Sequence, residues 1–160
     1  MTLQAWLSED AGDLMLRAAR AAYPNETGGI LVGVKVRRRP WITHAVEIPS
    51  NNAGAGHYTL QGYARQSAVD VIRAIDHRLG YIGEWHSHPA DVAPSRQDVR
   101  AIAFLSRDPA AECPHPVLAV VRRSGGAWLI DVREWRLTGA KPLRLIAAGG
   151  LLEPEAEMRM

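Results

Sequence analysis

Two histidines and one aspartate have the types and the spacing of metal ligands. His86 and His88 stand two residues apart at the end of a segment expected to be a strand, so both imidazoles point to one face and can reach one ion. Asp98 follows ten residues later, where a chain that turns back at residues 89–94 would bring its carboxylate beside them. Two histidines, one aspartate and a water complete a tetrahedral catalytic zinc site, so the pattern makes these three residues candidate ligands.

Each of these residues also has an ordinary structural explanation. A histidine at a strand end is commonly a hydrogen-bonded polar residue, and Ser95 followed three residues later by Asp98 matches a helix capping box. Glu26, just before a glycine pair, could solvate a turn, and Ser95 could serve only as a cap. A catalytic role is favoured by the five residues taken together, since each lies at or near one end of an expected core strand or helix.

The expected elements place these residues at such positions. A first helix begins after Ser8 and carries apolar residues at helical spacing until it stops near Tyr23, before Pro24. Residues 30–36 form an apolar, β-branched run that predicts a buried strand, with residues 41–48 as its hairpin partner. Residues 49–57 predict a loop that could line a cleft.

The second half of the chain is also predicted to consist of helices and strands that follow one another. A second helix is expected to end at Gly80, with an apolar face made of Ala64, Ala68, Val71, Ile72, Ile75 and Leu79. A short strand, 81–85, leads into the histidines, and Ser95 begins a third helix. Residues 117–123 and 128–135 predict a final hairpin, and residues 153–160 a frayed end. This order indicates a mixed α/β or α+β fold.

Composition restricts the class of protein. The chain has 160 residues, 47% of them hydrophobic and 22% charged, which is typical of one globular domain. It has no apolar run near the ~20 residues of a membrane helix and no apparent signal peptide, so we expect a soluble, cytoplasmic protein without a membrane partner. The single cysteine, Cys113, leaves histidines and carboxylates as metal ligands. The net charge of +2 and one arginine run at residues 37–39, expected to be a solvated turn, make nucleic acid an improbable partner.

Taken together, three segments resemble the JAMM (MPN-plus) family of zinc metallopeptidases. The segments are Glu26-Thr27-Gly28-Gly29-Ile30-Leu31-Val32-Gly33, Trp85-His86-Ser87-His88-Pro89 and Pro94-Ser95-Arg96-Gln97-Asp98. The resemblance implies a single-domain JAMM/MPN-like fold over residues 1–146, with a central curved β-sheet flanked by helices and a flexible tail at 147–160. Six residues separate His88 from Ser95, where the family usually has seven.

The resemblance also assigns roles. It implies that His86, His88 and Asp98 bind one zinc ion per chain, that Glu26 is the general base and that Ser95 steadies the oxyanion. General chemistry agrees, because zinc acidifies water, a carboxylate can carry the proton to the leaving amine, and a hydroxyl can donate to developing charge.

Other residues are expected to be structural. The thiol of Cys113 should be buried and His115 should lie in a loop, and Ser87 should bond to backbone. Trp85 is expected to lie in the core rather than against substrate. The glycines at 28, 29 and 33 do not form a phosphate loop and should allow close backbone approach.

The resemblance points to the compact prokaryotic type found with bacterial ubiquitin-like, CBASS-type conjugation operons. It implies a deubiquitinase-like isopeptidase that cuts after the C-terminal glycine of a ubiquitin-like protein, whose partners include that protein, its conjugates and activating-like and conjugating-like enzymes. Alternatives are a sulfur-carrier processing peptidase, a metal-free scaffold and a RadC-like DNA-associated protein. The substrate tail is expected to pair with an exposed strand edge beside the site, and a narrow cleft would favour glycines before the cut bond.

Overall fold

The computed structural model describes residues 2–50 and 62–148. Most of the predicted loop at 49–57 and the last residues of the predicted tail therefore lie outside the described residues. The described residues form ten elements: β1 (Gln4–Ser8), α1 (Glu9–Ala22), β2 (Gly28–Val36), β3 (Arg39–Glu47), α2 (Gly62–Ile75), β4 (Gly80–His88), α3 (Arg96–Arg107), β5 (Val117–Ser124), β6 (Ala127–Arg136) and β7 (Gly139–Ala148).

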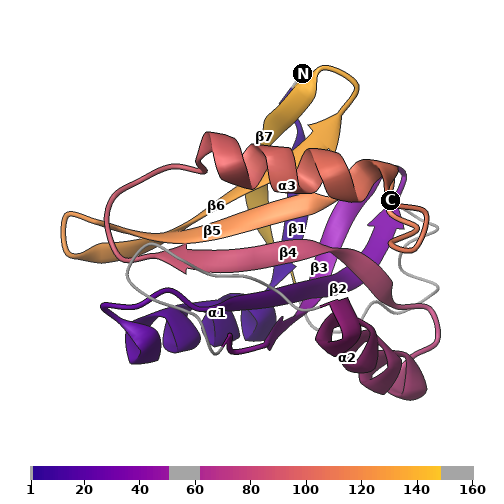
Figure 1. Cartoon of the computed structure of the whole chain (residues 1–160), viewed down its shortest axis with the longest axis horizontal. Coiled ribbons are helices and arrows are strands. Elements are labelled where there is room, and N and C mark those ends of the chain that lie inside the picture. Colours follow the sequence, from indigo (N-terminus) through magenta and orange to yellow (C-terminus); the bar gives the residue numbers. More distant parts are fainter. Residues whose placement is uncertain (1, 51–61, 149–160) are drawn as a thin grey trace.

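The seven strands close into a barrel in the order β1-β3-β2-β4-β5-β6-β7. Most neighbours are antiparallel, but β4 pairs parallel with β5, and β1 is parallel to both β3 and β7. Figure 1 shows β4 and β5 side by side, with α3 on one side of the sheet and α1 and α2 on the other side in this view. The predicted α+β class, with a single curved sheet and flanking helices, is confirmed.

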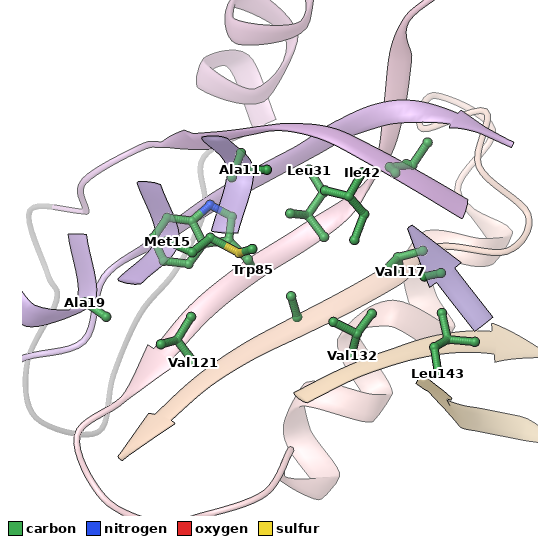
Figure 2. Packing of buried hydrophobic residues seen from close by; sticks show 14 of the residues in the cluster. Ala11, Met15, Ala19, Leu31, Ile42, Trp85, Val117, Val121, Val132 and Leu143 are labelled. Carbon is green, nitrogen blue, oxygen red and sulfur yellow. The ribbon is translucent and has the colours of Figure 1, made fainter. Parts of the chain in front are cut away.

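The main core lies between α1 and the inner faces of the strands. Small and flexible side chains of α1, among them Ala11 and Met15, are fully buried in one cluster with Leu31 and Trp85. Figure 2 shows Met15 among the strand side chains. Trp85 is 0% exposed and its indole N–H donates to the Val46 carbonyl over 3.2 Å. Its predicted place in the core is confirmed.

Local signals predicted several boundaries correctly. Ser8 caps α1, its Oγ accepting from the Ala11 amide over 3.2 Å. The arginine run forms the β2–β3 turn, in which Arg37 and Arg38 have φ of 50° and 68°. At the β5–β6 turn Gly125 and Gly126 have φ of 57° and 83°, which explains why glycines stand there. No helix in residues 2–50 and 62–148 is long and apolar enough to span a membrane.

The structure differs from the predicted elements at three points, which are β1, β7 and the end of the second helix. The strands β1 and β7 were not predicted, although they close the barrel through five register pairs from Gln4 to Ser8. The second helix does not reach Gly80, which instead opens β4. It ends at Ile75 because the Asp76 carboxylate accepts hydrogen bonds from the Arg78 amide and guanidinium and turns the chain.

The buried face of α2 matches the expected one only in part. The expected residues Ala68, Ile72 and Leu79 pack in one core cluster, together with Val69, which was not expected there. The placement of Val71 and Ile75 on this face was wrong, since they are 64% and 71% exposed. The helix lies against β2 and β4, and the barrel surface decides which part of the apolar face is buried.

Candidate metal centre

The two histidines lie at the end of β4, in the middle of the sheet. His86 is in register with Gly28 of β2 and with Val120 of β5, and His88 is in register with Arg122. Because side chains alternate along a strand, Glu84, His86 and His88 face the same side. The two Nε2 atoms lie 3.1 Å apart.

Asp98 meets the histidines from the first turn of α3. Its Oδ1 lies 3.2 Å from Nε2 of His86 and its Oδ2 lies 3.5 Å from Nε2 of His88. The capping box is present as well, since the Ser95 amide donates to Oδ2 over 2.6 Å and the Asp98 amide donates to Ser95 Oγ over 3.1 Å. Both interpretations of Asp98 therefore hold together, and the cap aims the carboxylate at the histidines.

A backbone contact determines which nitrogen His88 offers. Its Nδ1 lies 2.8 Å from the carbonyl oxygen of Val92. A carbonyl can only accept, so Nδ1 carries the proton and neutral His88 presents the lone pair of Nε2 to the site. Such a bond to the far ring nitrogen is the usual way in which proteins orient a metal-binding histidine.

The three donors fit a zinc ion. Zinc with bonds of about 2.05 Å in tetrahedral geometry holds its ligand atoms about 3.3 Å from one another. The two Nε2 atoms are 3.1 Å apart, Oδ1 of Asp98 is 3.2 Å from Nε2 of His86, and Oδ2 is 3.5 Å from Nε2 of His88. One ligand atom from each of the three residues lies within 4.8 Å of the other two. Two imidazole nitrogens and a carboxylate are also a donor set that zinc accepts. Among the described residues these three form the one group of metal-binding side chains that was found.

The pKa values of Asp98 and His88 are shifted by the close approach of these side chains. Burial would raise the pKa of the Asp98 carboxyl, but its contacts with the imidazoles of His86 and His88 outweigh burial and hold that pKa well below its usual range. The Asp98 hydrogen bond raises the pKa of His88 although burial opposes it. The three lone-pair donors therefore attract a positive charge to the point where they meet.

All five predicted residues line one pocket of about 440 Å³. Glu26, 9% exposed, reaches it from the segment just before β2. Ser95 reaches it from the start of α3, and its Oγ accepts from the Asp98 amide, which leaves its hydroxyl hydrogen to donate elsewhere. Apolar residues complete the lining: Pro89, Ala90, Val92, Ala101, Ile102 and Leu118, together with Trp85, whose side chain is buried in the core.

The expected exposed strand edge beside the site is wrong for the described residues. β4 pairs with β2 on one side and with β5 on the other, and His86 has a register partner on both. The barrel is closed, so an extended tail cannot add to β4 as a further strand.

Sequence reasoning did not identify Glu84, which lines the same pocket. Its Oε1 accepts from the Tyr81 hydroxyl over 3.1 Å and lies 3.5 Å from the Arg65 guanidinium. Burial raises the pKa of Glu84, and the contacts with Tyr81 and Arg65 offset only part of this. Its position two residues before His86 is the signal that could have found it, because strand alternation places both on one face.

The residues expected to be structural behave as such. Cys113 is buried, which raises the pKa of its thiol. His115 is an exposed residue whose Nδ1 lies 3.2 Å from the Trp135 carbonyl. A Cβ on Gly29 or Gly33 would lie 1.7 or 1.9 Å from a carbonyl oxygen of β3, so these glycines do allow close backbone approach.

The family follows from a direct comparison. A family model of prokaryotic homologs of the JAB domain matches residues 8–138. The chain belongs to this family. The match covers α1 through β6 and includes all five candidate residues, and it confirms the resemblance inferred from the motifs.

Individual relatives agree with this assignment. The chain is 27% identical over 135 residues to a protein of Sinorhizobium fredii (strain NBRC 101917 / NGR234) named probable metalloprotease y4qB, covering 78% of this chain and 79% of that protein. It is 29% identical over 123 residues to the CD-NTase/cGAS isopeptidase of Enterobacter hormaechei subsp. hoffmannii (strain UCI 50), covering 72% of this chain and 65% of that protein.

A solved structure shares the fold. The solution structure of protein DSY2949 from Desulfitobacterium hafniense superimposes with a TM-score of 0.73 at 21% identity, covering 92% of this chain and 95% of that one. This likeness supports the architecture of the barrel and its helices.

Proposed function

We propose that this JAB-family protein is a zinc-dependent isopeptidase or peptidase that cuts after the C-terminal glycine of a ubiquitin-like protein, as part of a bacterial antiphage conjugation system. The observation that carries the proposal is the convergence of His86, His88 and Asp98 at zinc-binding separations in the pocket that Glu26 also lines. The relatives named metalloprotease and isopeptidase support a hydrolase of this type.

Each of the five predicted site residues has a role in the proposed reaction. His86, His88 and Asp98 hold the zinc ion, which when bound supplies Lewis acidity toward water and a substrate carbonyl. Glu26 takes the proton of the attacking water and returns it to the leaving amine. Ser95 donates its hydroxyl hydrogen to the oxygen on which negative charge develops, since the helix cap uses this hydroxyl only as an acceptor.

The pocket also supports the preference for glycine. The histidines and Asp98 lie between the end of β4 and the start of α3, and the apolar residues Pro89, Val92 and Ile102 line the pocket with them. A scissile carbonyl must approach within bonding distance of the site, so side chains next to it would collide with these apolar residues. Glycines before the cut bond remove that conflict.

A cleavage assay tests the proposal. The substrate is the ubiquitin-like protein encoded beside this gene, or ubiquitin where none is encoded, joined to a reporter through an isopeptide bond in one arm and a linear peptide bond in the other. We expect zinc-dependent release with a Gly-Gly end and at least tenfold slower release with Ala-Val. Cleavage that survives a chelator would refute the zinc chemistry, and equal cleavage of both ends would refute the glycine preference.

A further inference from the structure

Ser87 stands between the two histidines but points away from them. Strand alternation turns its side chain to the opposite face of β4, where it is 1% exposed. There its Oγ accepts a hydrogen bond from the Thr27 amide over 2.9 Å, and the Ser87 amide donates to the Thr27 carbonyl over 2.8 Å. Ser87 thus holds both polar backbone groups of Thr27.

These bonds extend the pairing of β2 and β4 by one residue. The regular register begins at Gly28, opposite His86. Thr27 precedes the strand, and the Ser87 side chain takes the place of a backbone acceptor for its amide. The Thr27 hydroxyl donates in turn to Glu47 of β3 over 2.8 Å, so this residue is held from both neighbouring strands.

The residue next to Thr27 is Glu26, which reaches the pocket that the histidines and Asp98 share. Glu26 lies sixty residues from His86 in the chain, and the Thr27–Ser87 contact spans the same separation. Ser87 is therefore a direct connection between the residue that follows Glu26 and the strand that carries the ligands, next to the register pair of Gly28 with His86.

We infer that Ser87 is a positioning residue that holds Glu26 in register with the metal ligands. This inference rests on the proposed function, because it assumes that Glu26 acts on substrate there. Replacing Ser87 with alanine leaves the Thr27 amide buried without its acceptor, and the segment must shift to reach another. A displacement of about 1 Å at a reacting group costs about 100-fold in rate.

The test compares Ser87→Ala with a matched buried serine. Ser8 is also 1% exposed, and its Oγ accepts from the Ala11 amide and donates to the Thr43 carbonyl over 2.7 Å, at the N-terminus of α1. We expect Ser87→Ala to lower kcat about 10- to 100-fold with zinc content and KM unchanged. Ser8→Ala should lower the melting temperature and leave kcat within twofold. Ser87→Thr keeps the hydroxyl and should restore kcat.

A double variant separates a role through Glu26 from any other. If Ser87 acts through Glu26, adding Ser87→Ala to Glu26→Ala should slow the enzyme no further. Additive losses, loss of zinc from Ser87→Ala, or an unchanged kcat would each overturn the inference. If the parent protein cleaves nothing, the proposed function fails instead. Amide exchange by NMR then still tests the contact, since exchange of the Thr27 amide should accelerate in Ser87→Ala more than in Ser8→Ala.

Discussion

The two halves of the candidate site are held in different ways. In the sheet half, His86 and His88 come from β4, which is paired on both sides and has Ser87 buried beneath it. Glu26 belongs to the same half, because it comes from the segment just before β2. Asp98 and Ser95 come from the exposed first turn of α3, where one capping box holds them. The sheet half is part of the core, whereas the helix half depends on a few polar contacts near solvent.

The loop between His88 and Ser95 joins the two halves, and like the helix half it is held by a few polar contacts near solvent. Asp91, whose side chain is 50% exposed, forms an ion pair with Arg122 of β5 and accepts from Ser124 Oγ over 2.9 Å. One residue later the Val92 carbonyl accepts from His88. The loop has six residues where the JAMM pattern usually has seven, and these contacts show how a short loop still orients the histidine. The comparison predicts that substitutions in this joining loop cost less than substitutions of the five site residues.

The largest effect is expected from the ligands themselves, and it tests whether both halves are needed. His88→Ala removes a sheet ligand and Asp98→Ala removes the helix ligand. Each should lower bound zinc from about one ion per chain to nearly none and abolish cleavage, since three protein ligands leave no spare. Metal analysis of the purified variants decides this. Zinc retained at parent affinity by Asp98→Ala would show that the sheet half suffices.

Glu26→Ala should separate chemistry from binding within the sheet half. The variant should keep its zinc and lose about 10²- to 10⁴-fold in kcat, because the proton carrier is gone while the ligands stay. Metal analysis and single-turnover cleavage measure the two quantities. Glu26→Gln, which keeps the shape of the side chain, serves as the control for packing. A turnover number at the parent level would refute the base assignment.

Ser95→Ala tests the helix half, because the Ser95 hydroxyl both caps α3 and is proposed to stabilise the oxyanion. We expect kcat to fall about 100-fold with little change in KM, because the lost donor acts on charge that develops during the reaction. A cap alone behaves differently. If the variant loses only the ~1 kcal/mol typical of an N-cap and retains its kcat, the hydroxyl serves the helix and not the oxyanion.

The smallest effect is expected at the joining loop. Asp91→Ala should weaken zinc binding about three- to tenfold, since it loosens the segment whose carbonyl orients His88, while kcat of the zinc-loaded enzyme stays within twofold. Competition with a chromophoric chelator gives the affinity. Ser124→Ala, which removes one of the two anchoring contacts, should have a smaller effect. Unchanged affinity in Asp91→Ala would show that the short loop holds its shape without this anchor.

Much of the fold followed from local patterns. The starts of α1 and α3, the two hairpins and the buried strand β2 were predicted, because caps, glycine turns and apolar runs act within a few residues. The strands β1 and β7 gave no such signal. β1 has five residues, and β7 contains Pro142 and two charged side chains, Lys141 and Arg144. Both are stable because they pair with each other and close the barrel.

For the site, the sequence by itself determined which kinds of functional group are available. It supplied three candidate metal ligands, the Glu26 carboxylate and the Ser95 hydroxyl, and strand alternation already placed His86 and His88 on one face. Only the tertiary structure decided that Glu26 reaches the same pocket, because the register of Gly28 with His86 is a contact between distant segments. Glu84, Asp91 and Ser87 took their positions in the same way. Strand alternation places Glu84 on the face of His86 and turns Ser87 to the opposite face, but what these side chains contact depends on which strands and helices pack beside them.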